Sequence, residues 1–195
     1  MQSNARTWVG CAWLVMALAA MNAMAQASPA DVPAEPVGGQ HDFDWETGAW
    51  KTELRRLAKP LSGSRQWIEY SGTSVVRKLL DGRANLVELR VEGPAGKIEG
   101  ASLRLFDPQG GQWILHYANA RTGRLARPIH GGFRDRRGEF YGQEDLDGKV
   151  VLVRFIISQI TADSAQFEQA YSDDGGRTWE TNWIAVDTRI GSEGK

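Results

Sequence analysis

Short β-rich runs separated by turn residues fill the chain from residue 50 onward, and they limit the folds that it can adopt. The runs are rich in Val, Ile, Leu, Tyr, Trp and Thr, and Asp-Gly, Gly-Pro or Gly-Gly sequences separate them. About ten such runs, with turn signals every 8–12 residues, predict an all-β sandwich or barrel. Gly72, inside one long run, predicts a bulge or a bend. The predicted strands are 50–57, 67–80, 85–92, 100–106, 113–120, 131–134, 139–146, 149–160, 165–172 and 178–189.

Most of the predicted strands are joined to the next by a short turn. Successive hairpins favour an up-and-down antiparallel meander over a Greek key. A meander of about eight to ten strands removes its unpaired edges when it closes into a ring. We therefore predict an all-β, up-and-down antiparallel β-barrel of about 8–10 strands as a single domain over residues 41–190.

The N-terminal residues have the order of a secretory signal peptide. Arg6 is followed by an apolar stretch over residues 8–21 and by the small residues 23–25. This A-x-A pattern predicts cleavage after Ala25. A membrane anchor is the alternative, but the stretch is shorter than the roughly 18–20 residues of a spanning helix, and no basic cluster follows it. We expect a signal peptide over residues 1–25, a flexible linker over 26–40, and a periplasmic or secreted protein.

The only cysteine, Cys11, lies inside the predicted signal peptide. Its removal leaves no thiol for a disulfide, a nucleophile or a metal site, although an exported compartment allows disulfides. Removal of Arg6 leaves 22 basic residues against 24 acidic ones, a net charge of −2. Nucleic-acid binding usually needs a clustered basic surface, so this charge argues against a nucleic-acid partner. We also expect no membrane partner after cleavage.

One short segment near the C-terminus resembles the Asp-box, S-x-D-x-G-x-T-W. The matching residues are Ser172, Asp174, Gly176, Thr178 and Trp179. In this motif the Ser and Asp side chains satisfy backbone amides of the turn, and a glycine adopts a positive φ. The motif occurs once here, whereas a propeller needs repeats. It therefore predicts a stable hairpin and carries no prediction about glycan chemistry.

Several motifs spread along the predicted barrel together resemble one family. They are Asp42-Phe43-Asp44, Gly48-x-Trp50, Ser102–Leu105 with Asp107-Pro108 and Gln112-Trp113, Gly131-x-Phe133, Gly138–Gly142, Val153–Phe155 and Glu168–Trp183. From about residue 41 to residue 189, the chain resembles the domain-of-unknown-function family 1579. The resemblance implies a closed, lipocalin-like (calycin-like) barrel with an internal cavity. It implies no established activity and no established catalytic residues.

Arg154 is the first candidate binding residue, because it interrupts the apolar run 150–157. A charge in such a strand is costly unless it is paired. Hairpin turns near positions 162 and 175 would place Arg154 opposite Ala170, and Glu168 opposite Asn182, all on one face. We predict that Arg154, Glu168 and Asn182 form a site inside the barrel for a carboxylate or another anion. The alternative is an internal ion pair that binds nothing.

Further candidates for polar ligand contacts are Arg104, which lies between two leucines, and Tyr117. Six of the eight tryptophans follow the predicted signal peptide, and some of them should line the barrel interior. Plain core packing explains such aromatics, and so does an apolar or aromatic ligand pocket. We therefore expect any ligand to be small and partly apolar or anionic.

No established chemistry is visible in the titratable residues. The histidines are His41, His116 and His130, and they lack the H-x-H or H-x-x-x-H spacing of metal ligands. The acids near 144–147 and 173–174 occupy turns, where carboxylates usually satisfy backbone amides. A nucleophile elbow and a phosphate-binding loop are both absent from the sequence. We predict no catalytic residue, no metal and no cofactor.

Three functions remain open from the sequence. The first is a barrel that binds a small-molecule ligand. The second is a structural or protein-interaction domain with a filled barrel, in which a second copy of the chain covers the strand 150–157. The third is an enzyme, which would need a carboxyl group of raised pKa inside a cavity open to solvent.

Overall fold

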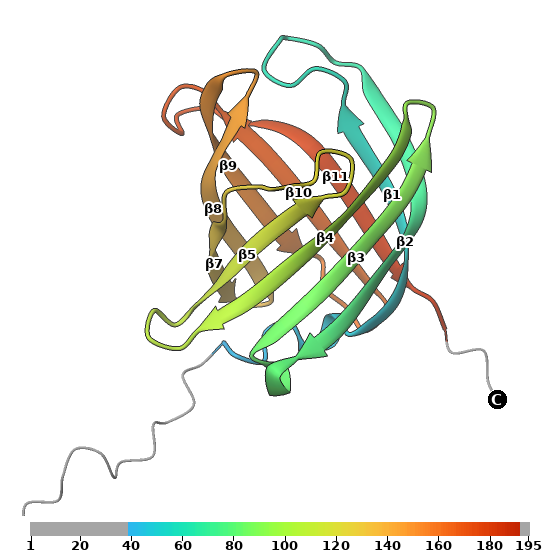
Figure 1. Ribbon diagram of the computed structural model, residues 1–195, viewed down its shortest axis with the longest axis vertical. Helices are drawn as coiled ribbons and strands as arrows, with labels where there is room; N and C mark the ends of the chain where they lie inside the picture. The colour runs from blue at the N-terminus through green and yellow to red at the C-terminus, as the bar shows by residue number, and fades with distance from the viewer. Residues whose placement is uncertain (1–38, 192–195) are drawn as a thin grey trace, which may run out of the picture. The chain divides into compact units, whose positions relative to one another are not determined.

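A computed structural model describes residues 39–191 of the protein, which form an antiparallel β-barrel (Figure 1). The predicted signal peptide, its cleavage after Ala25 and nearly all of the predicted linker lie outside the described residues. Within residues 39–191, no helix has the length and hydropathy of a membrane span.

Ten strands make the wall of the barrel. In space they follow the order β4-β3-β2-β1-β11-β10-β9-β8-β7-β5, and the pairing of β4 with β5 closes the ring. Every neighbouring pair is antiparallel, so the predicted fold class is confirmed. The elements are η2 (Asp44–Glu46), β1 (Gly48–Leu57), β2 (Trp67–Leu79), η3 (Leu80–Gly82), β3 (Ala84–Gly93), β4 (Gly96–Asp107), β5 (Gln112–Asn119), β6 (Arg124–Leu125), β7 (Ile129–Arg134), β8 (Arg137–Leu146), β9 (Lys149–Ser158), β10 (Ser164–Ser172) and β11 (Glu180–Arg189).

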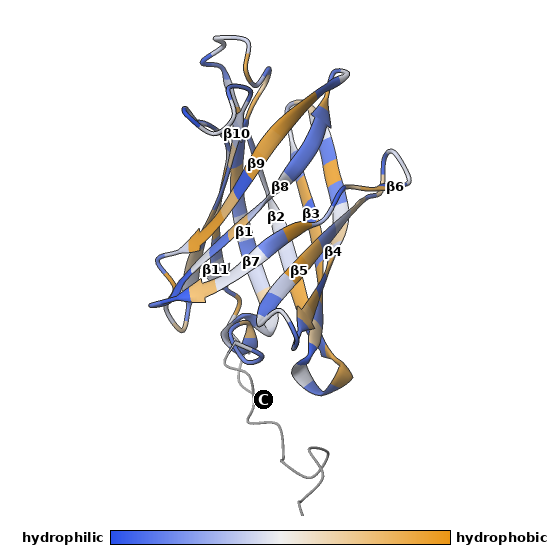
Figure 2. Ribbon diagram, turned by 90° about the vertical axis from the view of Figure 1, so that its left-hand side faces the viewer, coloured by the Kyte–Doolittle hydropathy of each residue, from blue (hydrophilic) through white to orange (hydrophobic). Residues whose placement is uncertain are grey.

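Side-chain alternation places one face of each strand in the core, as β1 illustrates. Trp50, Thr52 and Leu54 are buried, whereas Lys51 and Glu53 between them are exposed. Polar and apolar segments consequently alternate along several strands, although β9 is apolar along most of its length (Figure 2). The main core joins buried aliphatic and aromatic side chains from strands all around the barrel. Burial of this apolar surface is the main stabilising contribution to the fold.

One end of the barrel is covered by the short helix η2 and the residues just before it; we call this the closed end. Phe43 is buried there and packs edge-on against Trp113 and Phe133, with both centroid distances at 4.9 Å. Trp50 of β1 donates a hydrogen bond from Nε1 to the carbonyl of Glu46, at 2.7 Å. The N-terminal segment is thereby part of the core.

Arg189, the last residue of β11, ties the closed end together. Its guanidinium lies over the Trp50 ring, 4.0 Å from the centroid. It donates hydrogen bonds to the carbonyls of Trp45 and Thr47 at 2.6 and 2.9 Å, and to the Ala162 carbonyl at 2.8 Å. One side chain thus satisfies backbone groups from two separate parts of the chain.

The predicted bulge at Gly72 is wrong, and a register shift occurs instead between β10 and β11. Gly72 pairs with Thr52 and with Val91 without a register shift. A Cβ atom at Gly72 would overlap the Arg90 carbonyl oxygen, so the glycine is needed for close backbone approach. The observed shift lies between Gln169 and Ala170 on β10, where β11 contributes one extra residue.

Candidate functional site

Polar side chains occur at two levels inside the barrel, and the first level is at the closed end. Arg104 of β4 forms an ion pair with Glu46 of η2, and its Nη2 donates to Oε1 of Glu46 at 3.3 Å. The guanidinium also lies 4.3 Å from the Phe43 ring centroid. Only 5% of the Arg104 side chain and 2% of the Glu46 side chain are exposed. Arg104, predicted as a ligand contact, is thus already paired within the protein.

Asp187 of β11 is a second buried carboxyl group at the closed end. It lies opposite Thr52, whose hydroxyl is 2.8 Å from that of Ser74. Burial raises the pKa of Asp187 to about 6. Its Oδ1 atom and the Oδ1 atom of Asn85 are buried without hydrogen-bond partners among residues 39–191. The closed end therefore holds the carboxyl groups of Glu46 and Asp187 away from solvent.

The second level lies towards the opposite, distal end, where the β1–β2, β3–β4, β8–β9 and β10–β11 connections are. Arg56 of β1 shares the inward face of Trp50, Thr52 and Leu54 and pairs with Ile68 and Trp183. Its positive charge acts on two tyrosines of other strands, Tyr117 and Tyr171. Within residues 39–191, Arg56 forms no ion pair. The distal interior thus contains a cation without a charged partner.

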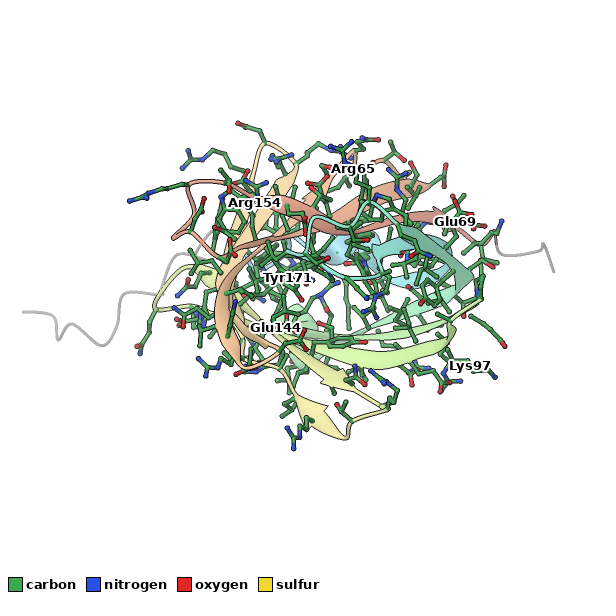
Figure 3. The ribbon with its side chains drawn as sticks, turned by 90° about the horizontal axis from the view of Figure 1, so that it is seen from above. Arg65, Glu69, Lys97, Glu144, Arg154 and Tyr171 are labelled. Carbon is green, nitrogen blue, oxygen red and sulfur yellow. The ribbon has the colours of Figure 1, made fainter. Side chains whose placement is uncertain are left out.

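Tyr171 and Glu144 form a hydrogen-bonded pair beside Arg56. The Tyr171 hydroxyl donates to Oε2 of Glu144 at 2.6 Å, and both side chains lie within the ring of strands when the barrel is viewed from above (Figure 3). Burial and the Glu144 carboxylate raise the pKa of Tyr171 well above its ordinary value, against the opposing effect of Arg56. The hydroxyl therefore stays a protonated donor at physiological pH.

Tyr117 of β5 completes this polar group. Burial raises its pKa, and the charge of Arg56 offsets part of that rise. A Cβ atom at Gly100 of β4 would overlap the Tyr117 hydroxyl oxygen, so only glycine leaves room for this ring. Tyr117 was predicted as a polar ligand contact, and the structure brings it near Arg56.

Apolar side chains surround these polar groups and partly cover them. Val151, Val153 and Tyr171 form a small buried cluster, and Leu61 from the β1–β2 loop packs on it. The backbone N–H of Leu61 donates to Oε1 of Glu180, which holds the loop against β11. The distal interior is therefore amphipathic, with a lining of aliphatic side chains around Arg56.

The predicted position of Arg154 inside the barrel is wrong. Arg154 does lie opposite Ala170, as predicted, but its neighbours Val153 and Phe155 take the inward positions of β9. The guanidinium lies over the Trp179 ring, 4.8 Å from its centroid, on the outer face. Figure 3 shows Arg154 apart from the Tyr171–Glu144 pair.

Glu168 shares the outer face with Arg154, and Asn182 does not join them. Glu168 lies opposite Ile184 and accepts a hydrogen bond from the Thr181 hydroxyl at 3.2 Å. Asn182 is the extra residue of the β10–β11 irregularity; it is buried, and its Oδ1 accepts from Gln169 at 3.0 Å. The predicted pairing of Glu168 with Asn182 is therefore wrong, because the shifted register places Asn182 beside inward-facing Gln169.

The connection between β10 and β11 is a self-contained turn. Oδ1 of Asp174 accepts hydrogen bonds from the backbone of Arg177 and Thr178 at 2.9 and 3.0 Å, and Ser172 Oγ accepts from the Gly176 N–H at 2.9 Å. These bonds to the exposed carboxylate lower the pKa of Asp174 to about 2. The turn is thus ordered by its own side chains rather than by a ligand.

The remaining titratable groups form no further cluster of clear chemistry. Among residues 39–191, no three His, Cys, Asp or Glu side chains gather as metal ligands would. His41 instead contacts Asp44 at 3.1 Å, next to Lys78, in an open hollow of about 490 Å³ between the N-terminal segment and the β2–β3 turn. The distal group around Arg56 remains the best candidate site.

Comparisons with known proteins show similarity of fold. No family model and no curated protein matches the chain. The S-type phycobiliprotein lyase CPES from Guillardia theta matches with a TM-score of 0.56 and 11% identity, over 79% of this chain and 93% of that one. Two other solved structures are less similar. The barrel EF1p2_mFAP2b bound to DFHBI matches with a TM-score of 0.43 and 7% identity, over 77% of this chain and 98% of that one. A fluorescence-activating β-barrel of de novo design matches with a TM-score of 0.41 and 12% identity, over 76% of this chain and 98% of that one. The lyase and this chain share a calycin-like barrel fold.

Proposed function

We propose that the protein binds a small amphipathic ligand with an anionic group in the distal interior of its barrel. Arg56 carries this proposal, because it is a cation on the inward face without an ion pair among the described residues. Arg56 is partly buried, and a partly desolvated charge is stabilised when a counter-ion reaches it. A carboxylate or sulfonate on the ligand would supply that counter-ion.

The neighbouring groups fit the same ligand. The protonated Tyr117 hydroxyl lies near Arg56, and a guanidinium with such a donor binds a planar anion well. Tyr171, whose hydroxyl donates to Glu144, would line the site. Gln169 and Asn182, which are hydrogen-bonded to each other, would border the polar part. Val151, Val153 and Leu61 would contact the apolar part, with Leu61 moving aside as the ligand enters.

Substitution of Arg56 tests the proposal. In an Arg56→Met variant, the affinity for the anionic probes 1-anilinonaphthalene-8-sulfonate and dodecanoate should fall about 10- to 100-fold, as expected for the loss of a charged hydrogen-bonding partner. Probe fluorescence and isothermal calorimetry measure this change. Arg55→Met is the matched control, because Arg55 is exposed and lies over Trp67 at 5.0 Å. Its variant should bind within about twofold of the parent.

Equal affinity of the Arg56→Met and Arg55→Met variants would contradict the site. A filled barrel that binds nothing is the second candidate, and the packing of Leu61 over Val151, Val153 and Tyr171 favours it. Failure of the parent protein to bind either probe would support that candidate. An enzyme in the distal interior finds little support, because the two carboxyl groups of raised pKa among residues 39–191, Asp42 and Asp187, both lie at the closed end.

We also propose that the chain is exported and that it belongs to the domain-of-unknown-function family 1579, with an Asp-box turn at Ser172–Trp179. The leader pattern supports export, and the calycin-like barrel with the motifs quoted above supports the family. Intact mass of the protein recovered from its producing cells should correspond to a chain that begins at Gln26. A mass that retains residues 1–25 would contradict cleavage.

A further inference from the structure

A short hairpin arm projects from the barrel wall between β5 and β7 (Figure 2). We call residues 120–128 the arginine arm. Its strand β6 pairs with the end of β5, and the Ala126 N–H donates to the Tyr117 carbonyl at 2.8 Å. At its turn, Asn119 Oδ1 accepts from the backbone of Arg121 and Thr122 at 3.0 and 3.2 Å. The arm is therefore held in one conformation while it extends into solvent.

The exposed side chains of the arm are basic and apolar. Arg121, Arg124 and Arg127 are all exposed, and none of them forms an ion pair within residues 39–191. Some other surface cations of the barrel are paired, such as Arg77 with Glu88, whereas Arg65 and Arg134 form no ion pair among the described residues. Leu125 is 69% exposed, more than any other large apolar side chain of the described part. The protein thus holds three unpaired cations around a leucine that nothing in the barrel covers.

We propose that the arginine arm docks on an anionic phospholipid bilayer. Guanidinium groups near such a surface are attracted by its negative potential, and a leucine between them gains by entering the headgroup boundary. A nucleic acid would satisfy the arginines and leave the leucine exposed, so the bilayer accounts for both kinds of side chain. The inference goes beyond the proposed ligand site and does not depend on it. It differs from the expectation, drawn from cleavage of the predicted signal peptide, that the mature protein has no membrane partner.

Vesicle binding of the protein produced from its full gene tests the docking surface. The parent should sediment with vesicles of 70% phosphatidylcholine and 30% phosphatidylglycerol, and at least about tenfold less with pure phosphatidylcholine. The triple variant R121Q/R124Q/R127Q should lose about 100-fold in partition coefficient, since each arginine contributes roughly fivefold. The Leu125→Ser variant should lose about tenfold in partition coefficient, whereas a substitution at an unrelated surface position should leave the coefficient unchanged.

A matched control variant distinguishes the effect of the arginine arm from the effect of the protein's total charge. Arg90, Arg134 and Arg136 are also exposed, and the variant R90Q/R134Q/R136Q removes the same charge from other parts of the barrel. This control should bind the anionic vesicles within about threefold of the parent. Equal partition of the arm variant and the control would overturn the proposal. Binding of the parent to a duplex DNA, without binding to the anionic vesicles, would overturn it in favour of a nucleic acid.

Discussion

Replacement of Glu46 with alanine is expected to lower the free energy of unfolding by about 3–5 kcal/mol, because it leaves the Arg104 guanidinium buried without its counter-ion. Both side chains are almost completely buried, so solvent cannot replace the carboxylate. The stacking of Arg104 on Phe43 holds the guanidinium in place. Urea unfolding followed by tryptophan fluorescence measures the change.

The double variant E46L/R104M is the control for this experiment. It removes both charges and fills the space with apolar side chains, and its stability should lie within about 1–2 kcal/mol of the parent. A Glu46→Ala variant as stable as the double variant would mean that Arg104 finds another partner. In that case the ion pair between Glu46 and Arg104 would not be needed to hold η2 against the barrel.

Asp187 is expected to make the barrel less stable as the pH rises from 4 to 7. Its folded pKa of about 6 exceeds its ordinary value of 3.8, so the folded state binds the proton more tightly than the unfolded state. The stabilising contribution is complete below about pH 4 and is lost as the pH rises through about 6. Two pKa units correspond to about 3 kcal/mol in the free energy of unfolding.

The Asp187→Asn variant isolates this effect. Its amide remains neutral, so the difference in stability between variant and parent should shift by about 3 kcal/mol in favour of the variant between pH 4 and pH 8. The lowered pKa of Asp174 changes stability only at lower pH and equally in both proteins. Urea unfolding at intervals of one pH unit measures the profiles, and parallel profiles would refute a raised pKa.

The barrel fold could be predicted from the sequence because the sequence patterns that mark its strands and turns are local. Turn residues mark the hairpins, and alternation marks the strands: the predicted run 67–80 matches β2 at Trp67–Leu79 almost to the residue. Closure follows from the physical cost of unpaired edges. The strand β6 was missed because two residues without an alternating pattern resemble a loop.

The candidate site was harder to predict, because inward and outward faces differ by one residue. Along β9 both faces are apolar, so the pattern could not show that Arg154 points outward. Asn182 was misplaced because a one-residue irregularity on β10–β11 leaves no clear mark in the sequence. Arg56 had a readable signal: it follows Trp50, Thr52 and Leu54 at intervals of two residues, and its inward direction follows from that spacing.

No local sequence pattern predicts contacts between residues that are far apart in the chain. Arg104 is separated from Glu46 by 58 positions, and Glu144 is separated from Tyr171 by 27. The residues that flank Arg104 or Glu144 in the sequence do not specify which residue each one contacts. Such pairs become visible only when the strand order around the ring is known.

The pairing of β1 with β11 has a consequence for how the chain acquires its structure. These strands begin at Gly48 and Glu180, so the first and last strands of the wall must meet before the ring closes. Synthesis and the proposed export both deliver the chain from its N-terminus, so one edge of β1 stays unpaired until β11 has followed. Closure should therefore be a late and slow step, and a nascent chain stalled before β11 should remain open to proteases and chaperones.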